Sequence, residues 1–168
     1  MCSSDLRELS VGYRVPRQIL DYASSLLAVI APELRPASSL RADSGALSVT
    51  RVPPAALDRE VVAACALACT RPGSVAVIAA DPQVRMLAGA LDAAGMEHGA
   101  PGSDARLTLV PVTVAKGLEF DHVIVVEPAR IAGAEARGLQ RLYVALTRAV
   151  SRLTVLYAEP LPAPLPNR

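Results

Sequence analysis

The residues best suited to chemistry in this chain fall within one short stretch, residues 114–121, with the sequence Val-Ala-Lys-Gly-Leu-Glu-Phe-Asp. Lys116 is the only lysine and Phe120 the only phenylalanine among 168 residues. Gly117 permits a tight turn, and Glu119 presents a carboxylate before an apolar run of strand length. The pattern predicts a turn with exposed polar groups leading into a core strand. The alternative is an ordinary turn before a core strand, because Lys-Gly and Glu are common at strand ends without any functional role.

Arginines form a second set of candidate groups. Arg141 and Arg148 are two helical turns apart and Arg137 extends the row, so all three project from nearly one face of a predicted helix. Arg14 follows Tyr13 where a strand should meet a helix N-terminus, a place where anions meet free N–H groups. Guanidinium groups bind carboxylates and phosphates through a planar fork. The same arginines can also be solvated surface charges, with Tyr13 packed under the helix.

Other chemistries lack the residues they need. The single lysine is followed by Gly117 and Leu118 rather than by Ser or Thr, so the chain has no P-loop of its own for a triphosphate. His98 and His122 lack partners for a catalytic triad or a metal, and each is expected at the surface or at a sheet edge. The strand that ends at Glu127 resembles the magnesium-holding strand of P-loop enzymes, but without a P-loop. No metal site is predicted, and any catalysis must be shared with another domain.

Composition indicates one compact domain with an aliphatic core. Hydrophobic residues make up 52% of the chain but aromatic residues only 3%, so Ala, Val, Leu and Ile must fill the interior. A net charge of +1 argues against broad electrostatic attraction as the main source of affinity for nucleic acid. Cys65 and Cys69 lie four apart on a predicted helix and are expected to pack in the core. Together with Cys2 they form no zinc pattern and suit a reducing cytoplasm.

Strands and helices are predicted to alternate over residues 9–158. Strands are expected at residues 47–52, 74–80, 107–113, 123–126 and 153–157, and helices at 17–30, 58–70, 82–95 and 139–146. Asp58 and Asp81 are expected as helix N-caps and residues 128–136 as a loop. This order predicts an α/β domain with a mainly parallel sheet, in which ligands bind beyond the carboxyl ends of the strands.

The two ends of the chain are expected to lie outside this domain. Residues 1–8 are predicted to be disordered or the remnant of a strand, and residues 159–168 to be a Pro-rich tail that cannot join a sheet. The longest apolar runs are too short to cross a bilayer, and the N-terminus lacks the layout of a signal peptide. A cytoplasmic protein with no membrane partner is therefore expected.

Three segments, taken in order, resemble motifs IV, V and VI of the second RecA-like domain of UvrD/PcrA/Rep-type superfamily 1 helicases. They are residues 12–16 (Gly-Tyr-Arg-Val-Pro), 114–121, and 143–149 (Tyr-Val-Ala-Leu-Thr-Arg-Ala). The resemblance spans residues 9–158 and implies a three-layer RecA-like domain. The large 2B-type insertion usual between motifs IV and V in these helicases is absent, because predicted strands and helices already fill that segment.

The resemblance implies a set of nucleotide contacts. Tyr13 would stack on adenine, and Arg14 and Arg148 would reach the γ-phosphate of ATP as catalytic arginines. Glu119, beside Gly117 in the turn, would accept a hydrogen bond from the ribose. ATP and Mg²⁺ would be held mainly by a separate N-terminal P-loop RecA-like domain of the parent chain, so this chain alone should be inactive.

The resemblance also implies a partner on which the motor acts. Thr113 and Lys116 fall where these helicases meet single-stranded DNA, although Thr113-Val114 replaces the usual His-Ser. The segments Tyr-Arg-Val-Pro, Val-Val-Glu-Pro and Pro-Leu-Pro look most like HelD-type relatives, which act on RNA polymerase. The implied function is that of an ATP-dependent helicase or translocase domain. The alternative is a degenerate RecA-like docking module with no role in hydrolysis.

Overall fold

A five-stranded parallel sheet forms the centre of the molecule, in the strand order β3-β7-β6-β4-β5. The structure is a computed structural model that describes residues 11–12, 14–34, 36, 38–43 and 45–167. The strands of the sheet are β3 (Leu47–Arg51), β4 (Val75–Ala79), β5 (Leu107–Pro111), β6 (Phe120–Val126) and β7 (Ala149–Tyr157). Two short strands, β1 (Val11–Gly12) and β2 (Ser38–Ser39), pair in parallel apart from it. The predicted α/β fold with a parallel sheet is confirmed.

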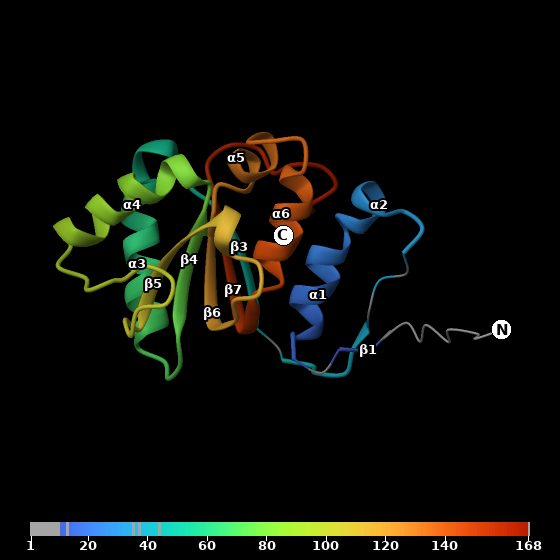
Figure 1. Ribbon diagram of the computed structural model, residues 1–168, viewed down its shortest axis with the longest axis horizontal. Coiled ribbons are helices and arrows are strands. Elements are labelled where there is room, and N and C mark those ends of the chain that lie inside the picture. Colours follow the sequence, from blue (N-terminus) through green and yellow to red (C-terminus); the bar gives the residue numbers. More distant parts are fainter. Residues whose placement is uncertain (1–10, 13, 35, 37, 44, 168) are drawn as a thin grey trace.

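Helices cover both faces of the sheet and complete three layers (Figure 1). On one face lie α3 (Leu57–Cys69) and α4 (Asp81–Ala93), and on the other α1 (Arg17–Ser24), α5 (Pro128–Gly133) and α6 (Gly138–Leu146), with the single turn α2 (Leu27–Ile30) following α1. In the described part of the chain, helices α1 to α4 and strands β2 to β5 occupy the segment between motifs IV and V, and no large inserted subdomain interrupts them. None of these helices is long and apolar enough to cross a membrane.

Strand alternation divides the interior into two aliphatic cores. In β6, Val123 and Val125 face α1 and α6, whereas Ile124 and Val126 face α3 and α4. Both faces of the central strands are therefore apolar, which explains their continuous hydrophobic runs in the sequence. Residues 158–167 contain no strand or helix, but Leu165 is buried in the core beside α1 and α6.

Two of the expected elements differ in extent. The helix expected over residues 17–30 is broken after Ser24, where the hydroxyl of Ser25 donates to the carbonyl of Tyr22 at 2.7 Å. Such a bond competes with the regular helical pattern. Residues 128–136, expected as a loop, contain α5 instead. Glu127 adopts a left-handed conformation with φ 50°, and the next residue, Pro128, is suited to a first helical position.

Neither predicted N-cap acts as one. Helix α3 begins at Leu57, after a 3-10 turn at Pro54–Ala56, so Asp58 lies inside its first turn. Helix α4 begins at Asp81 itself, and that carboxylate accepts a hydrogen bond from Thr113 rather than from its own helix. Both acids still lie near the positive ends of helix dipoles, where a negative charge is favourable.

The expectation that His122 lies at the surface or at a sheet edge is wrong. His122 is buried in β6 between β4 and β7, and its Nε2 lies 3.0 Å from the carbonyl oxygen of Pro72. Core packing is confirmed for Cys65, which is fully buried, and burial raises the pKa of its thiol to about 12. Cys69 is only partly buried at the edge of the same core.

Helices α5 and α6 are in close contact at Gly138, the first residue of α6, and a substitution there tests this contact. A Cβ atom at this position would overlap the carbonyl oxygen of Ala132, which belongs to the backbone of α5. Gly138→Ala should lower the free energy of unfolding by about 1–3 kcal/mol, measured by urea denaturation. Gly89 in α4 has no neighbour within 4 Å of the same position, so Gly89→Ala should raise it by up to about 1 kcal/mol. Equal effects of the two substitutions would contradict the close contact.

Candidate functional site

Three predicted site residues meet where β6 and β7 begin. Glu119 directly precedes β6 and Arg148 directly precedes β7, and the N–H of Phe120 donates to the carbonyl of Arg148 at 3.1 Å. Arg14 arrives from the segment after β1, and its Nη1 lies 2.8 Å from Oε1 of Glu119. These two residues are 105 positions apart in the chain. The fold therefore gathers one residue from each of the three motif-like segments.

This position corrects the expectation that the ligand-facing residues lie beyond the carboxyl ends of the strands. Glu119 and Arg148 stand at the amino ends of β6 and β7, because residues 112–119 lead from the carboxyl end of β5 back to the opposite edge. Helix α6 delivers Arg148 to the same edge in the same way. Of the predicted site residues, Thr113 stays near the carboxyl end of β5.

Arg148 is held by groups of its own surroundings. Its Nε donates to the carbonyl of Val144 at 3.0 Å, Nη1 to the carbonyl of Leu118 at 3.1 Å, and Nη2 to the hydroxyl of Thr147 at 3.4 Å. A guanidinium has five N–H groups, so one remains on each terminal nitrogen. This pair fits two oxygens of a phosphate or a carboxylate. Nearby, burial raises the pKa of Tyr143, and the positive charge of Arg148 opposes that rise.

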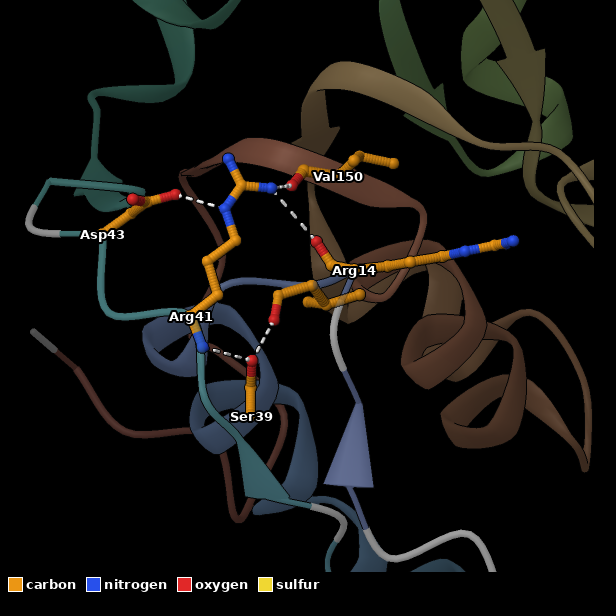
Figure 2. A network of polar contacts seen from close by, with 6 residues as sticks. Arg14, Ser39, Arg41, Asp43 and Val150 are labelled. Carbon is orange, nitrogen blue, oxygen red and sulfur yellow. Dashed lines mark hydrogen bonds and ion pairs between the residues drawn. The ribbon is translucent and has the colours of Figure 1, made fainter.

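The backbone that carries Arg14 is fastened to β7 by Arg41 (Figure 2). Nη1 of Arg41 donates to the carbonyl of Arg14 at 3.3 Å and to that of Val150 at 2.8 Å, and Nε pairs with Asp43 at 2.7 Å. The hydroxyl of Ser39 accepts the Arg41 N–H at 3.2 Å. The side chain of Arg14 extends away from this network and is 75% exposed, and its ion pair with Glu119 is the contact that a ligand would have to replace.

Sequence reasoning missed Arg41 altogether. It lies in a polar connection between elements, and the two carbonyls it joins belong to residues 27 and 109 positions away. No local pattern marks such a residue, since its role exists only after the distant segments have come together. An Arg within an otherwise Pro- and Ser-rich connection is the one sequence signal available.

The remaining predicted residues are more dispersed. Tyr13 lies outside the described residues. Gly117 has φ +84°, a conformation that favours glycine, and its surroundings are open to solvent. The hydroxyl of Thr113 donates to Asp81 at 2.6 Å, and Lys116 is exposed on the side of α6. Thr113 and Lys116 therefore lie apart from the cluster at the amino edge.

The donor set suits a nucleotide but supplies no metal site. Two guanidinium groups beside a half-exposed carboxylate match the phosphate and sugar hydroxyls of a nucleotide. In the described ranges, no three His, Cys, Asp or Glu side chains gather as metal ligands. The acid of the magnesium-like strand, Glu127, is buried and accepts the N–H groups of Ala158 and Glu159, so it joins the ends of β6 and β7.

The fold and part of the sequence of this chain are similar to those of helicase domains. The fold is similar to that of the C-terminal domain of a possible DNA helicase from Lactobacillus plantarum WCFS1, with a TM-score of 0.69 and 27% identity over 92% of this chain and 91% of that one. Residues 107–156 match the model of the UvrD-like helicase C-terminal domain. The matched segment contains Thr113, Gly117, Glu119 and Arg148. The chain therefore has a fold similar to that of a helicase C-terminal domain, and residues 107–156 are similar in sequence to the C-terminal domains of UvrD-like helicases.

Other comparisons add little to this assignment. A solved complex of the arterivirus nonstructural protein 10 helicase with DNA shares 17% identity with this chain, over 73% of this chain and 32% of that one, with a TM-score of 0.49. No curated protein matches the chain in sequence.

Asp121 ties the start of β6 to the start of β4 and gives a pH-dependent contribution to stability. The N–H of Ser74 donates to Asp121 at 2.8 Å and its hydroxyl at 3.0 Å, and these bonds hold the pKa of that carboxyl below its usual value. A lowered folded-state pKa stabilises the protein fully above pH about 4, and this contribution is lost as the pH falls through the lowered value. Asp121→Asn should therefore cost about 1 kcal/mol at neutral pH and progressively less below pH about 4.

Urea denaturation at a series of pH values measures this difference. Asp104→Asn, at an exposed position with no recorded partner in the described residues, should change stability by a few tenths of a kcal/mol at every pH. A cost of Asp121→Asn that does not change with pH would contradict a role for the charge.

Removing Arg41 should detach the segment that carries Arg14. Arg41→Ala loses both carbonyl contacts and the ion pair, so it should lower the free energy of unfolding by about 1–3 kcal/mol in urea denaturation. Arg17→Ala loses only an exposed ion pair with Asp21 at 3.6 Å and should cost less than about 1 kcal/mol. Similar small losses for both variants would show that the network does not hold the segment.

Proposed function

We propose that this chain is the C-terminal RecA-like motor domain of an ATP-dependent superfamily 1 DNA helicase or translocase. The observation that carries the proposal is the meeting of Arg14, Glu119 and Arg148 at one edge of the sheet, from three distant segments. The likeness to helicase C-terminal domains supports the class. ATP and Mg²⁺ would be held mainly by a separate P-loop domain of the parent protein, which this chain would complete.

The two arginines would stabilise the negative charge of the transferring phosphoryl group. Arg14 is paired with Glu119, but an exposed ion pair contributes about 1 kcal/mol or less, so a phosphate can replace the carboxylate at little cost. Glu119 is then free to accept a hydrogen bond from the ribose, beside the open turn at Gly117. Tyr13 would stack on the adenine. Arg148 keeps its backbone contacts and offers its two remaining N–H groups.

The polymer would contact the opposite side of the domain, through Thr113 and Lys116. A HelD-type role on RNA polymerase is the finer form of the proposal, and it rests on the short segments Tyr-Arg-Val-Pro, Val-Val-Glu-Pro and Pro-Leu-Pro. Stimulation of ATP turnover by RNA polymerase would support this form, whereas strong stimulation by single-stranded DNA would favour a DNA translocase. Either role implies a cytoplasmic location.

ATP turnover by the parent protein with both RecA-like domains tests the proposal. Arg148→Ala should lower turnover by about 10³-fold or more, because an arginine at the transferring phosphate is worth about 10³ to 10⁵ in rate. Arg148→Lys keeps the charge but loses the fork, and it should also lose most of the activity. Arg85→Ala, at an exposed residue of α4, serves as the matched control.

Urea denaturation of each variant checks that folding is intact, since Arg148 also holds backbone carbonyls. Unchanged turnover in Arg148→Ala, or no turnover in the wild type, would overturn the proposal and favour a docking module without a role in hydrolysis.

A further inference from the structure

A cavity of about 190 Å³ lies between α3 and the sheet, on the face of the sheet opposite α6. Figure 1 shows these two helices on opposite sides of the strands. The helix lines the cavity with Ala64 and Ala68, which are one turn apart. The sheet lines it with Ser48 and Thr154, which are paired on the adjacent strands β3 and β7. Because all four side chains are small, the helix and the sheet enclose space that they do not fill.

Two arginines give this cavity a positive charge. Arg71, in the turn after α3, and Arg152, in β7, both line it. Among the described residues, no Asp or Glu lines the cavity, and no ion pair joins either arginine to an acid. Nη1 of Arg71 donates to the carbonyl of Leu67 at 3.3 Å, and Nη1 of Arg152 to that of Gly45 at 2.6 Å. A guanidinium has five N–H groups, so each arginine keeps donors for an anion.

His122 adds a buried nitrogen atom that is not hydrogen-bonded. Its side chain lines the cavity, and the residue is only 6% exposed. Nε2 lies 3.0 Å from the carbonyl oxygen of Pro72, which can only accept, so this nitrogen carries a hydrogen. Nδ1 is shielded from solvent and has no partner in the part of the chain that the structure describes. Buried polar atoms are normally paired, so Nδ1 favours a ligand that offers a hydrogen-bonding group.

A carboxyl group suits this nitrogen in either protonation state of the histidine. A carboxylate accepts a hydrogen bond from Nδ1 of the imidazolium, and a carboxylic acid donates one to Nδ1 of the neutral ring. A carboxylate is also the anion that a guanidinium binds through two parallel hydrogen bonds. The polar groups of the cavity therefore favour a carboxylate over a neutral ligand.

We propose that this cavity binds a small carboxylate with a short aliphatic chain. The carboxylate is held by Arg71, Arg152 and His122, and the chain packs against Ala68 and Ile124. Pockets for drug-sized ligands have volumes of about 300–1,000 Å³, so the smaller volume found here limits the length of the chain. The inference is independent of the proposed function, because the cluster at the amino edge contributes no residue to this cavity.

The charge and the apolar lining make separate demands on the ligand. An inorganic anion such as phosphate can meet the arginines, but it leaves the apolar part of the cavity without a contact. An alcohol with a chain of the same length fills that part, but it brings no charge to the arginines. Each should therefore bind more weakly than the carboxylate.

The two histidines of the chain allow a test with an internal control. His122 lines the cavity, whereas His98 pairs with Asp92 of α4 and does not line it. Titration of the chain with sodium hexanoate should shift the imidazole NMR resonances of His122 with a dissociation constant on the order of 1 mM. The resonances of His98 should stay unchanged. Sodium phosphate and hexanol, at matched ionic strength, should each bind at least about tenfold more weakly.

Substitutions on and beside α3 test the location of the site. Ala64→Leu fills the cavity and should weaken binding at least about tenfold, whereas Ala66→Leu, at an exposed position of the same helix, should bind like the wild type. Arg71→Gln and Arg152→Gln should each weaken binding about three- to tenfold. Arg59→Gln, at an exposed residue of α3 that does not line the cavity, should leave it unchanged.

Urea denaturation with and without hexanoate shows that each variant is folded and gives a second measure of binding. The ligand should raise the midpoint for the wild type and for Ala66→Leu but not for Ala64→Leu, since a ligand stabilises only the state that binds it. Wild-type affinity in Ala64→Leu, equal shifts of His98 and His122, or no shift of His122 up to about 20 mM hexanoate would overturn the inference. Equal affinity for hexanol or for phosphate would also overturn it, because either result removes one of the two demands.

Discussion

The constraint on which the site depends is the short connection between β5 and β6. These strands are parallel and are separated by β4, yet only residues 112–119 lie between the end of one and the start of the other. Eight extended residues reach at most about 26–29 Å, little more than the length of a seven-residue strand. The segment nevertheless contains a 3-10 turn at Val112–Val114 and a second turn that the N–H of Leu118 closes on the carbonyl of Ala115. Little length is left to spare, and Val112 and Ala115 are buried in the core that α6 shares. One end presents Thr113 and the other presents Glu119, at opposite edges of the sheet.

The arginines at the amino edge differ in how firmly they are held. Arg148 is half-buried and tied to two backbone carbonyls, so its position is set by α6 and by the turn before β6. Arg14 has a fixed backbone, through Arg41, and an exposed side chain whose one ion pair is weak. The same edge therefore combines one preorganised guanidinium with one that can adapt its position to a ligand.

The features of the fold that could be predicted from the sequence are those carried by local patterns. Continuous apolar runs at residues 75–79 and 123–126 indicate strands covered on both faces, and helical periodicity marks α3, α4 and α6. Helix α5 was missed because its start depends on the left-handed backbone of Glu127, which no propensity indicates. His122 was misplaced because a polar residue in a strand looks exposed until its neighbouring strands are known.

The sequence indicated residues that the fold brings together, but it did not indicate where in the fold they would meet. Motif-like segments indicated Arg14, Glu119 and Arg148, but the general rule for parallel sheets points to the carboxyl edge. Glu119 and Arg148 lie at the amino edge instead, because the connection before β6 and helix α6 both end there. The role of Arg41 could not be predicted from any local sequence pattern, because its partners are carbonyl groups from distant segments.

Helix α6 has a mechanical consequence that follows from its length. Nine residues of α-helix span about 13 Å, and a helix this short bends very little. Val144 lines a groove between Lys116 and the first turns of α6, and its carbonyl accepts the Nε–H of Arg148, so no flexible joint separates the two ends of the helix. Gly138 rests against the backbone of α5, which blocks movement in that direction. Any tilt imposed at the first turn must therefore reappear as a displacement of Arg148, and this one short helix can synchronise events at the two edges of the sheet.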